Sequence, residues 1–215
     1  MLSAMIAFAA AAAAQVVVVE QRSVSFTVGN QAFTMPVPEG LCAPTGKLTT
    51  FAELMASADE ANSTVVSLYA CDRSPEVPAT WEYVLIKVPR GVEHKTLAKP
   101  VAVNALKEVL ESQDAPKFDQ DMQDEIEAGY KDNLGLNVKF KGNFGYMGYD
   151  ADCAYIGGSL TVKVEDKEGL VIGSTCMSAA GGKIMAVNYY VDPGAGDVAY
   201  AKRRSREIFV SIKPQ

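Results

Sequence analysis

The sequence predicts an α+β domain in which an antiparallel β-sheet carries helices packed on its faces, an α/β/α sandwich. Three observations favour this class: strand-like segments follow one another through tight turns, a few segments with helical spacing interrupt them, and neither an internal repeat nor a long linker is present. Strands joined by short turns pair antiparallel, because parallel neighbours need a long crossover connection. An amphipathic helix then buries its apolar stripe on the sheet.

The composition is that of a globular protein and excludes several function classes. Of the 215 residues, 48% are hydrophobic and 21% are charged, which rules out a disordered or fibrous chain. Acidic residues outnumber basic ones by 26 to 20, and this balance argues against a nucleic-acid partner. A single histidine excludes a site built from several histidines, and the sequence predicts neither a metal nor a cofactor.

The first residues predict export. Leu2 to Ala14 is apolar apart from Ser3, and small residues precede Gln15, as a signal peptidase requires. We therefore expect a signal peptide over 1–14, a single domain over 15–215 and a periplasmic or secreted location. One feature does not fit a signal peptide, because no Lys or Arg precedes the apolar run. Two alternatives stay open: an uncleaved membrane anchor reaching to Val19, and a buried segment of a cytosolic protein.

The cysteines agree with export. The sequence has an even number of cysteines, Cys42, Cys71, Cys153 and Cys176, and no CxxC pair. This pattern favours two disulfides over a zinc or redox centre. The alternative is four buried thiols. We expect Cys42–Cys71, because the strand and helix directions bring both residues to one end of the sheet.

The second expected bridge, Cys153–Cys176, flanks a predicted turn over Asp166–Gly169. With a two-residue turn at Asp166-Lys167, Cys176 lies four residues from the position opposite Cys153. Four residues span about 13 Å along a strand, so this bridge needs a bulge or a different register.

The elements of the first half follow from periodicity and breakers. Strands over 16–28 and 32–37 form a hairpin, and Pro36, Pro38 and Gly40 end it. A helix over 51–61, capped by Thr49 or Thr50, carries one apolar face at helical spacing, made of Phe51, Leu54, Met55 and Ala58. The next strands are 64–71 and 81–88, and a polar loop over 72–78 separates them.

The second half begins with two helices and ends with one. The apolar faces of the first two helices run from Val103 to Leu110 and from Phe118 to Tyr130, and Gly135 ends the second. A meander follows, with strands near 138–146, 153–164, 170–177 and 184–191 and a turn at Gly181-Gly182. The last helix spans 197–212, with Asp197 as its N-cap. Its inward residues are Val198, Ala201, Ser205, Ile208, Phe209 and Ile212.

Few residues suggest chemistry. His94 lies beside Glu93 in a polar loop, which suits an exposed side chain better than a general base, and no nucleophile motif accompanies it. The acids of 114–127 are spread along a helix, whereas a calcium loop gathers its ligands at a tight turn. Asp150 and Asp152 form a loop pair that could hold a cation, although an ordinary turn explains them as well.

The densest basic cluster lies on the last helix. Lys202, Arg203, Arg204 and Arg206 fan around it, leaving the apolar positions for the core. They are candidate residues for binding an acidic partner or an anionic lipid surface. The alternative is a solvated face whose aliphatic stems pack on the sheet edge.

Two short segments resemble a known family. The strand that enters a proline–glycine loop, Met35-Pro36-Val37-Pro38-Glu39-Gly40, and the final strand Asn188-Tyr189-Tyr190-Val191 with the helix end Ile208 to Lys213 look like those of PsbP-like domains. The nuclear-transport factor Mog is similar in fold. The resemblance implies an α/β/α sandwich and a largely non-catalytic family of photosystem subunits, assembly factors and a GTPase-binding protein. The four cysteines and the two-helix insert at 101–133 depart from that pattern.

The residues and the resemblance together predict an exported, non-catalytic domain with a protein-binding or assembly role and no membrane span in its mature form. Two other classes stay open. A hydrolase using loop carboxylates requires acids or a histidine converging in one cleft, and a carrier of a small apolar ligand requires a large apolar pocket.

Overall fold

The computed structural model describes residues 22–57, 59–71, 82–112, 124, 127–128, 131–132, 135, 137–164 and 166–215. The described strands and helices follow one another in this order: β1 (Ser23–Val28), β2 (Gln31–Pro36), β3 (Leu41–Cys42), α1 (Lys47–Ser57), β4 (Asn62–Ala70), β5 (Tyr83–Pro89), α2 (Lys99–Ser112), β6 (Val138–Tyr149), β7 (Ala154–Val164), β8 (Lys167–Ala180), β9 (Lys183–Val191), α4 (Val198–Ser211) and β10 (Lys213–Pro214).

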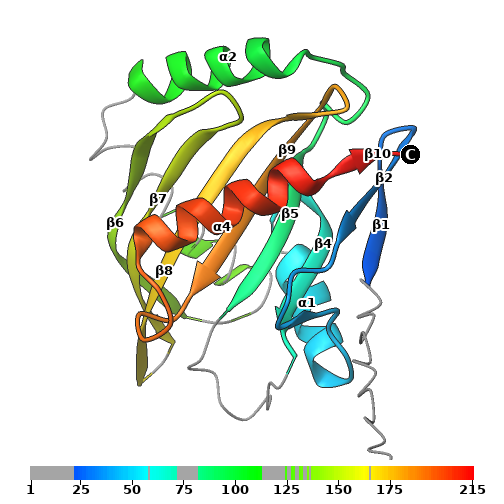
Figure 1. The fold of residues 1–215 in the computed structure, drawn as a ribbon. Coiled ribbons are helices and arrows are strands. Elements are labelled where there is room, and N and C mark those ends of the chain that lie inside the picture. The colour runs from blue at the N-terminus through cyan, green and yellow to red at the C-terminus, as the bar shows by residue number, and fades with distance from the viewer. Residues whose placement is uncertain are drawn as a thin grey trace, which may run out of the picture.

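The described strands form two antiparallel sheets, so the antiparallel α+β class is confirmed. The larger sheet has the order β3-β4-β5-β9-β8-β7-β6, and the smaller one the order β1-β2-β10 (Figure 1). The expectation of one sheet is wrong. Proline ends β2 at Pro36, and Gly40 turns the chain with a φ of 79° before β3 pairs with β4. The first hairpin therefore forms its own sheet, which β10 completes.

Helix α4 lies within the predicted span 197–212 and contacts β7, β8 and β9 of the larger sheet (Figure 1). The Asp197 carboxylate accepts a hydrogen bond from the Tyr200 N–H at 2.7 Å, so the predicted N-cap is confirmed. Ala201, Ser205, Ile208 and Phe209 are buried, as their spacing predicts. They meet a core that includes Phe33, Met35, Tyr155, Tyr189 and the Cys153–Cys176 bridge.

Helix α1 differs from its prediction. It runs from Lys47 to Ser57 instead of 51–61, and the Thr49 hydroxyl donates to the Pro44 carbonyl instead of capping the helix. Its expected apolar face is also wrong in part. Ala52 is the buried residue of this helix, and Leu54 is exposed. The helix starts earlier than predicted because the N–H groups of Leu48 and Thr49 donate to the carbonyls of Thr45 and Gly46.

The helix predicted from the Val103–Leu110 stripe is α2, which contacts β6, β7 and β8. The second predicted helix lies mostly outside the described residues. Those described between 124 and 132 are helical. The predicted loop over 72–78 and the leader over 1–14 also lie outside the described part of the chain.

The meander confirms the predicted strands and corrects one register. Ala180 pairs with Lys183 across Gly181-Gly182, both with positive φ, as predicted. At the previous turn, however, Val164 pairs with Lys167. The predicted turn at Asp166-Lys167 is therefore misplaced, and the pairing of β7 with β8 shifts by two residues.

This shift explains the disulfide that the predicted register did not allow. Tyr155 pairs with Cys176, so Cys153 stands diagonally across from Cys176 on the same sheet face, with the Cα atoms 5.3 Å apart. The Cys42–Cys71 bridge joins β3 to the end of β4 with a Cα separation of 4.9 Å. Both predicted pairs are confirmed.

Candidate functional site

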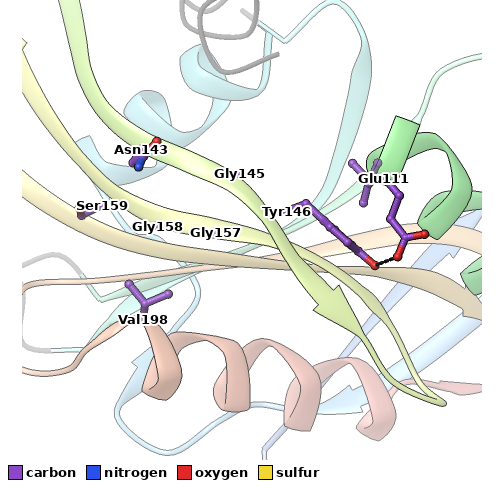
Figure 2. A pocket seen from close by; sticks show the side chains of 9 residues that line it. Glu111, Asn143, Gly145, Tyr146, Gly157, Gly158, Ser159 and Val198 are labelled. Atoms are coloured by element: carbon purple, nitrogen blue, oxygen red, sulfur yellow. Dashed lines mark hydrogen bonds between the residues drawn. The ribbon is translucent and has the colours of Figure 1, made fainter. Parts of the chain in front are cut away.

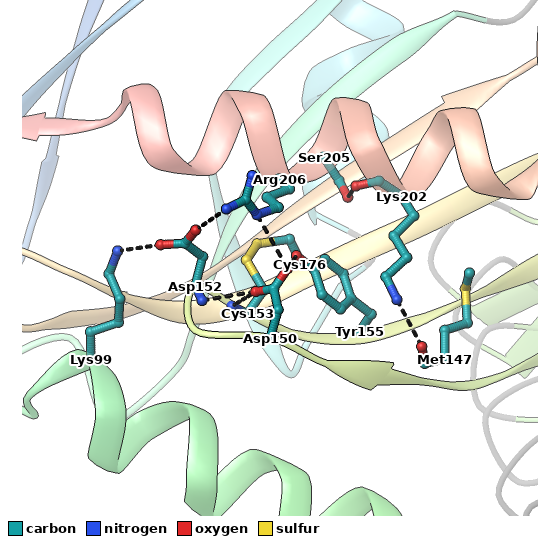
Figure 3. A network of polar contacts seen from close by, with 10 residues as sticks. All are labelled: Lys99, Met147, Asp150, Asp152, Cys153, Tyr155, Cys176, Lys202, Ser205 and Arg206. Carbon is teal, nitrogen blue, oxygen red and sulfur yellow. Dashed lines mark hydrogen bonds and ion pairs between the residues drawn. A yellow bond between two sulfur atoms is a disulfide. The ribbon is translucent and has the colours of Figure 1, made fainter.

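Two clusters that the sequence marks separately meet beside the Cys153–Cys176 bridge. Arg206 of α4 approaches the β6–β7 turn, with its Nε 3.2 Å from Asp150 Oδ2 and its Nη2 2.5 Å from Asp152 Oδ2 (Figure 3). Lys99 of α2 reaches the other oxygen of Asp152 at 3.0 Å. We call Lys99, Asp150, Asp152 and Arg206 the turn network. It ties α2, α4 and the turn together.

Asp150 accepts three hydrogen bonds from residues that follow it in the chain. Its Oδ1 accepts from the N–H groups of Asp152 and Cys153, and its Oδ2 accepts from the Tyr155 hydroxyl at 2.7 Å. Burial alone would raise its pKa, but these three hydrogen bonds and the charge of Arg206 outweigh it, so the pKa of Asp150 is lowered. The same environment raises the pKa of Tyr155, first through burial and then through the bond to Asp150.

The turn network does not resemble a cation site. The Asp150 and Asp152 carboxylates are occupied by Arg206, Lys99 and local N–H groups. Within the described part of the chain, no three Asp, Glu, His or Cys residues gather as metal ligands would. The network is a set of ion pairs that holds the turn against two helices.

The four basic residues of α4 have four different environments. Lys202 donates to the Met147 carbonyl at 2.9 Å and lies 4.3 Å from the centre of the Tyr155 ring. Arg206 belongs to the turn network. Arg204 is 23% exposed, pairs with Glu207 at 3.0 Å and stacks over the Tyr189 ring.

Arg203 is the open member of the cluster. Its side chain is 61% exposed, its closest acidic contact is Glu207 at 3.9 Å, and its guanidinium lies 5.3 Å from the centre of the Tyr200 ring. Such an exposed ion pair contributes little free energy. Arg203 therefore keeps its charge available at the surface, next to an aromatic ring.

The ring neighbours of Arg203 and Arg204 belong to a second polar chain. The Tyr189 hydroxyl donates to the Glu82 carboxylate and lies 3.4 Å from the Tyr200 hydroxyl. Burial, and then the bond to Glu82, raises the pKa of Tyr189. These contacts fix the rings on which the two arginines lie.

A shallow depression of about 650 Å³ lies between α2, the middle of β6 and β7, and the start of α4 (Figure 2). Glycines and small polar side chains form much of its lining, together with Leu110 and Val198. Glu111 accepts a hydrogen bond from the Tyr146 hydroxyl at its rim. The depression is open and holds one carboxylate, so it offers neither the acid pair of a hydrolase nor an enclosed apolar cavity.

The other sequence candidates lie elsewhere. His94 is exposed, and its Nδ1 lies beside Gly29, in the β1–β2 turn. Of the acidic stretch 114–127, Asp124 and Glu127 are described, and the sequence did not predict the role of Glu127. Its carboxylate accepts from the Phe140 N–H at 2.8 Å and pairs with Lys139, so it covers part of the β6 edge. No pattern in the sequence predicts that a helix carboxylate pairs with an edge strand in this way.

The lowered pKa of Asp150 predicts acid sensitivity. A carboxyl whose folded pKa is below its unfolded value stabilises the fold above about pH 4 and loses that contribution as the pH falls. We expect Asp150→Asn to cost about 1 kcal/mol at neutral pH, a modest figure because the pair with Arg206 is partly exposed. Its loss relative to wild type should shrink towards pH 2.

Urea unfolding between pH 2 and 7 measures this dependence. The matched control is Asp166→Asn at the β7–β8 turn, because Asp166 forms no ion pair with any described residue. An Asp150→Asn effect that does not change with pH would show that the loss is steric and not electrostatic.

The fold and this site define a class: an α+β domain with a braced, partly basic surface. No protein-family model matches the chain, and no curated protein matches it. Among solved structures, cyanobacterial PsbP (CyanoP) from Synechocystis is similar, with a TM-score of 0.43 and 13% identity over 95% of this chain and 98% of that one. This is a remote likeness of fold, and nothing about activity or partners follows from it.

Proposed function

We propose that the chain is an exported domain without catalytic activity, which binds an acidic segment of a partner protein through the exposed side of α4. The observation that carries the proposal is Arg203, which combines a largely exposed charge with an aromatic neighbour, Tyr200. Arginine and tyrosine are enriched among the residues that dominate protein interfaces.

The contacts of the α4 cluster divide it into two roles. Lys202, Arg204 and Arg206 each have a partner within the domain, so we assign them to bracing the surface. Arg203 is then the residue that meets the partner, and Arg206, which is also partly exposed, lies at the border of the interface. Because the braced residues are already ordered, binding here restricts chiefly the side chain of Arg203.

The geometry gives less support to the two alternative classes. A hydrolase requires converging acids, and the acids of the turn network point at Arg206 and Lys99. A carrier requires an enclosed apolar cavity, and the depression at β6 and β7 is open and partly polar. The surface of α4 is the feature that these alternatives leave without a role.

Export remains part of the proposal. Two disulfides are typical of an oxidising compartment, and in the described residues no helix is long and apolar enough to cross a membrane. We propose cleavage near Ala14, one domain over 15–215, and a sandwich with α2 and α4 on opposite faces of the larger sheet. N-terminal sequencing of the exported protein tests the cleavage, and an intact Met1 would contradict it.

A site-specific photo-cross-linker tests the binding surface. Placed at Arg203 in the producing cell, it should give a discrete protein adduct, whereas the same group at the exposed Lys167 of the β7–β8 hairpin should give none. The adduct should weaken when the partner's acidic segment is neutralised. Equal labelling from both positions, or none from Arg203, would overturn the proposal.

A further inference from the structure

The sheet edges of this protein differ in how they are protected. An exposed edge strand offers unpaired N–H and C=O groups to other chains, and proteins block such edges with charges, prolines, bulges or short strands. Four strands are edges of the two described sheets: β1 and β10 of the smaller, β3 and β6 of the larger.

Three of these edges carry protection. β3 and β10 are two residues long, and β10 consists of Lys213 and Pro214. β6 bears Lys139 and Lys141, has a register shift between Tyr146 and Tyr149, and is covered in part by the Glu127 carboxylate. A second chain would meet repulsion, a bend or too short a strand at each of them.

β1 has none of these devices. Its six residues, Ser-Val-Ser-Phe-Thr-Val, contain no charge, no proline and no register shift. It pairs with β2 on one side, and no other described strand pairs with it. In Figure 1 it lies at the margin of the molecule, beside β2.

The backbone groups that β1 turns outward follow from its pairing with β2. The Val37 N–H bonds to the Arg22 carbonyl, so position 22 faces β2, and the alternation of an antiparallel ladder makes 24, 26 and 28 do the same. The N–H and C=O groups of Ser23, Ser25 and Thr27 therefore point away from β2. Their side chains are exposed, whereas those of Phe26 and Val28 are buried.

We propose that β1 pairs antiparallel with β1 of a second copy of this chain. With Ser25 opposite Ser25 on a two-fold axis, Ser23 faces Thr27, and Val24 faces Phe26. Polar side chains then meet polar ones, apolar side chains meet apolar ones, and the three outward residues of each strand exchange about six backbone hydrogen bonds. β1 contains no charged residue, so no like charges face each other across this interface. If β6 paired with β6 of a second copy, Lys139 and Lys141 would face the same two lysines of that copy.

The pairing joins the two smaller sheets into one continuous sheet, β10-β2-β1-β1-β2-β10. It uses neither α4 nor the turn network, so it stands independently of the proposed partner surface. The Ser25 hydroxyl accepts a hydrogen bond from the Gln215 side chain at 3.1 Å. Among the described residues, a substitution at Ser25 removes this side-chain hydrogen bond and no other.

Charge pairs at Ser25 test the proposal, because the residue faces its own copy. Sedimentation of the mature protein at sub-millimolar concentration should show a dimer for wild type and for the control Ser25→Ala. Ser25→Lys and Ser25→Glu should each weaken dimerisation roughly fivefold, since like charges then stand opposite each other. Mixing these two variants should restore a dimer that contains one chain of each.

Ser25→Pro is the second probe, because it removes an outward N–H without breaking a bond to β2. It should give a folded monomer with an unchanged circular dichroism spectrum. A monomeric wild type would overturn the proposal, and so would dimers that resist all three substitutions or a Lys–Glu mixture that stays monomeric.

Discussion

Replacing Gly158 with alanine is expected to destabilise the protein by about 3 kcal/mol, the upper end of the usual cost of overpacking. Gly158 lies in β7 opposite Phe144 of β6. A Cβ atom at this position would sit 1.7 Å from the Asn143 carbonyl oxygen and 2.8 Å from its carbonyl carbon. Both obstacles are backbone atoms, so no side-chain rotation relieves the overlap and the two strands must separate locally.

The same pair of strands provides the control. Gly145 lies in β6 opposite Gly157, and a Cβ atom there would meet nothing within 4 Å. Gly145→Ala should therefore leave stability unchanged or raise it by up to about 1 kcal/mol, because alanine narrows the unfolded ensemble. Urea unfolding of both variants decides the matter. Two alanine variants of equal stability would show that β6 and β7 are not packed as closely as described.

Loss of either disulfide is the second large expected effect. The bridges close loops of 29 and 23 residues, and loops of this size contribute about 3 kcal/mol by restricting the unfolded chain. We expect Cys42→Ser/Cys71→Ser to lose about that amount. Cys153→Ala/Cys176→Ala should lose more, because both cysteines are fully buried against the core and their removal leaves a void.

In the folded wild type, the more exposed disulfide should be reduced first. Cys71 is exposed, whereas Cys153 and Cys176 are inaccessible to solvent. A mild reductant followed by alkylation should therefore label Cys42 and Cys71 first, and peptide mapping identifies the sites. If Cys153 and Cys176 are labelled at the same rate, the fold opens globally before any bridge is reduced.

The sequence predicts the meander and α4 well because their signals are local. Alternation fixes the strand faces, Gly181-Gly182 fixes one turn, and Asp197 fixes a helix start. The β7–β8 register is different, since a two-residue turn fits several positions near Asp166 at similar cost. A shift of two residues keeps every side chain on its own face, so the hydrophobic pattern cannot detect it.

The candidate site was predictable in its parts and not in its assembly. Asp150, Asp152 and Arg206 each stand out in the sequence, but Arg206 and Asp152 are 54 positions apart, and no local pattern links them. Likewise, Lys213-Pro214 reads as a tail because proline disfavours strands, yet it completes the smaller sheet. The Arg206 pairing also changes the interpretation of the basic cluster, since most of its charge is used within the domain.

The placement of β5 beside β9 has a consequence for how the chain folds. The Tyr189 hydroxyl bonds to Glu82 across 107 positions of sequence, whereas β6, β7 and β8 each pair with the next strand of the chain. Closing so long a loop costs more chain entropy than forming a hairpin, and such pairings slow folding. The meander is thus expected to nucleate first, offering β9 as a template onto which β5, β4 and β3 later dock. Until that docking, β9 exposes an apolar edge, and the slow step of folding is also the step most vulnerable to aggregation.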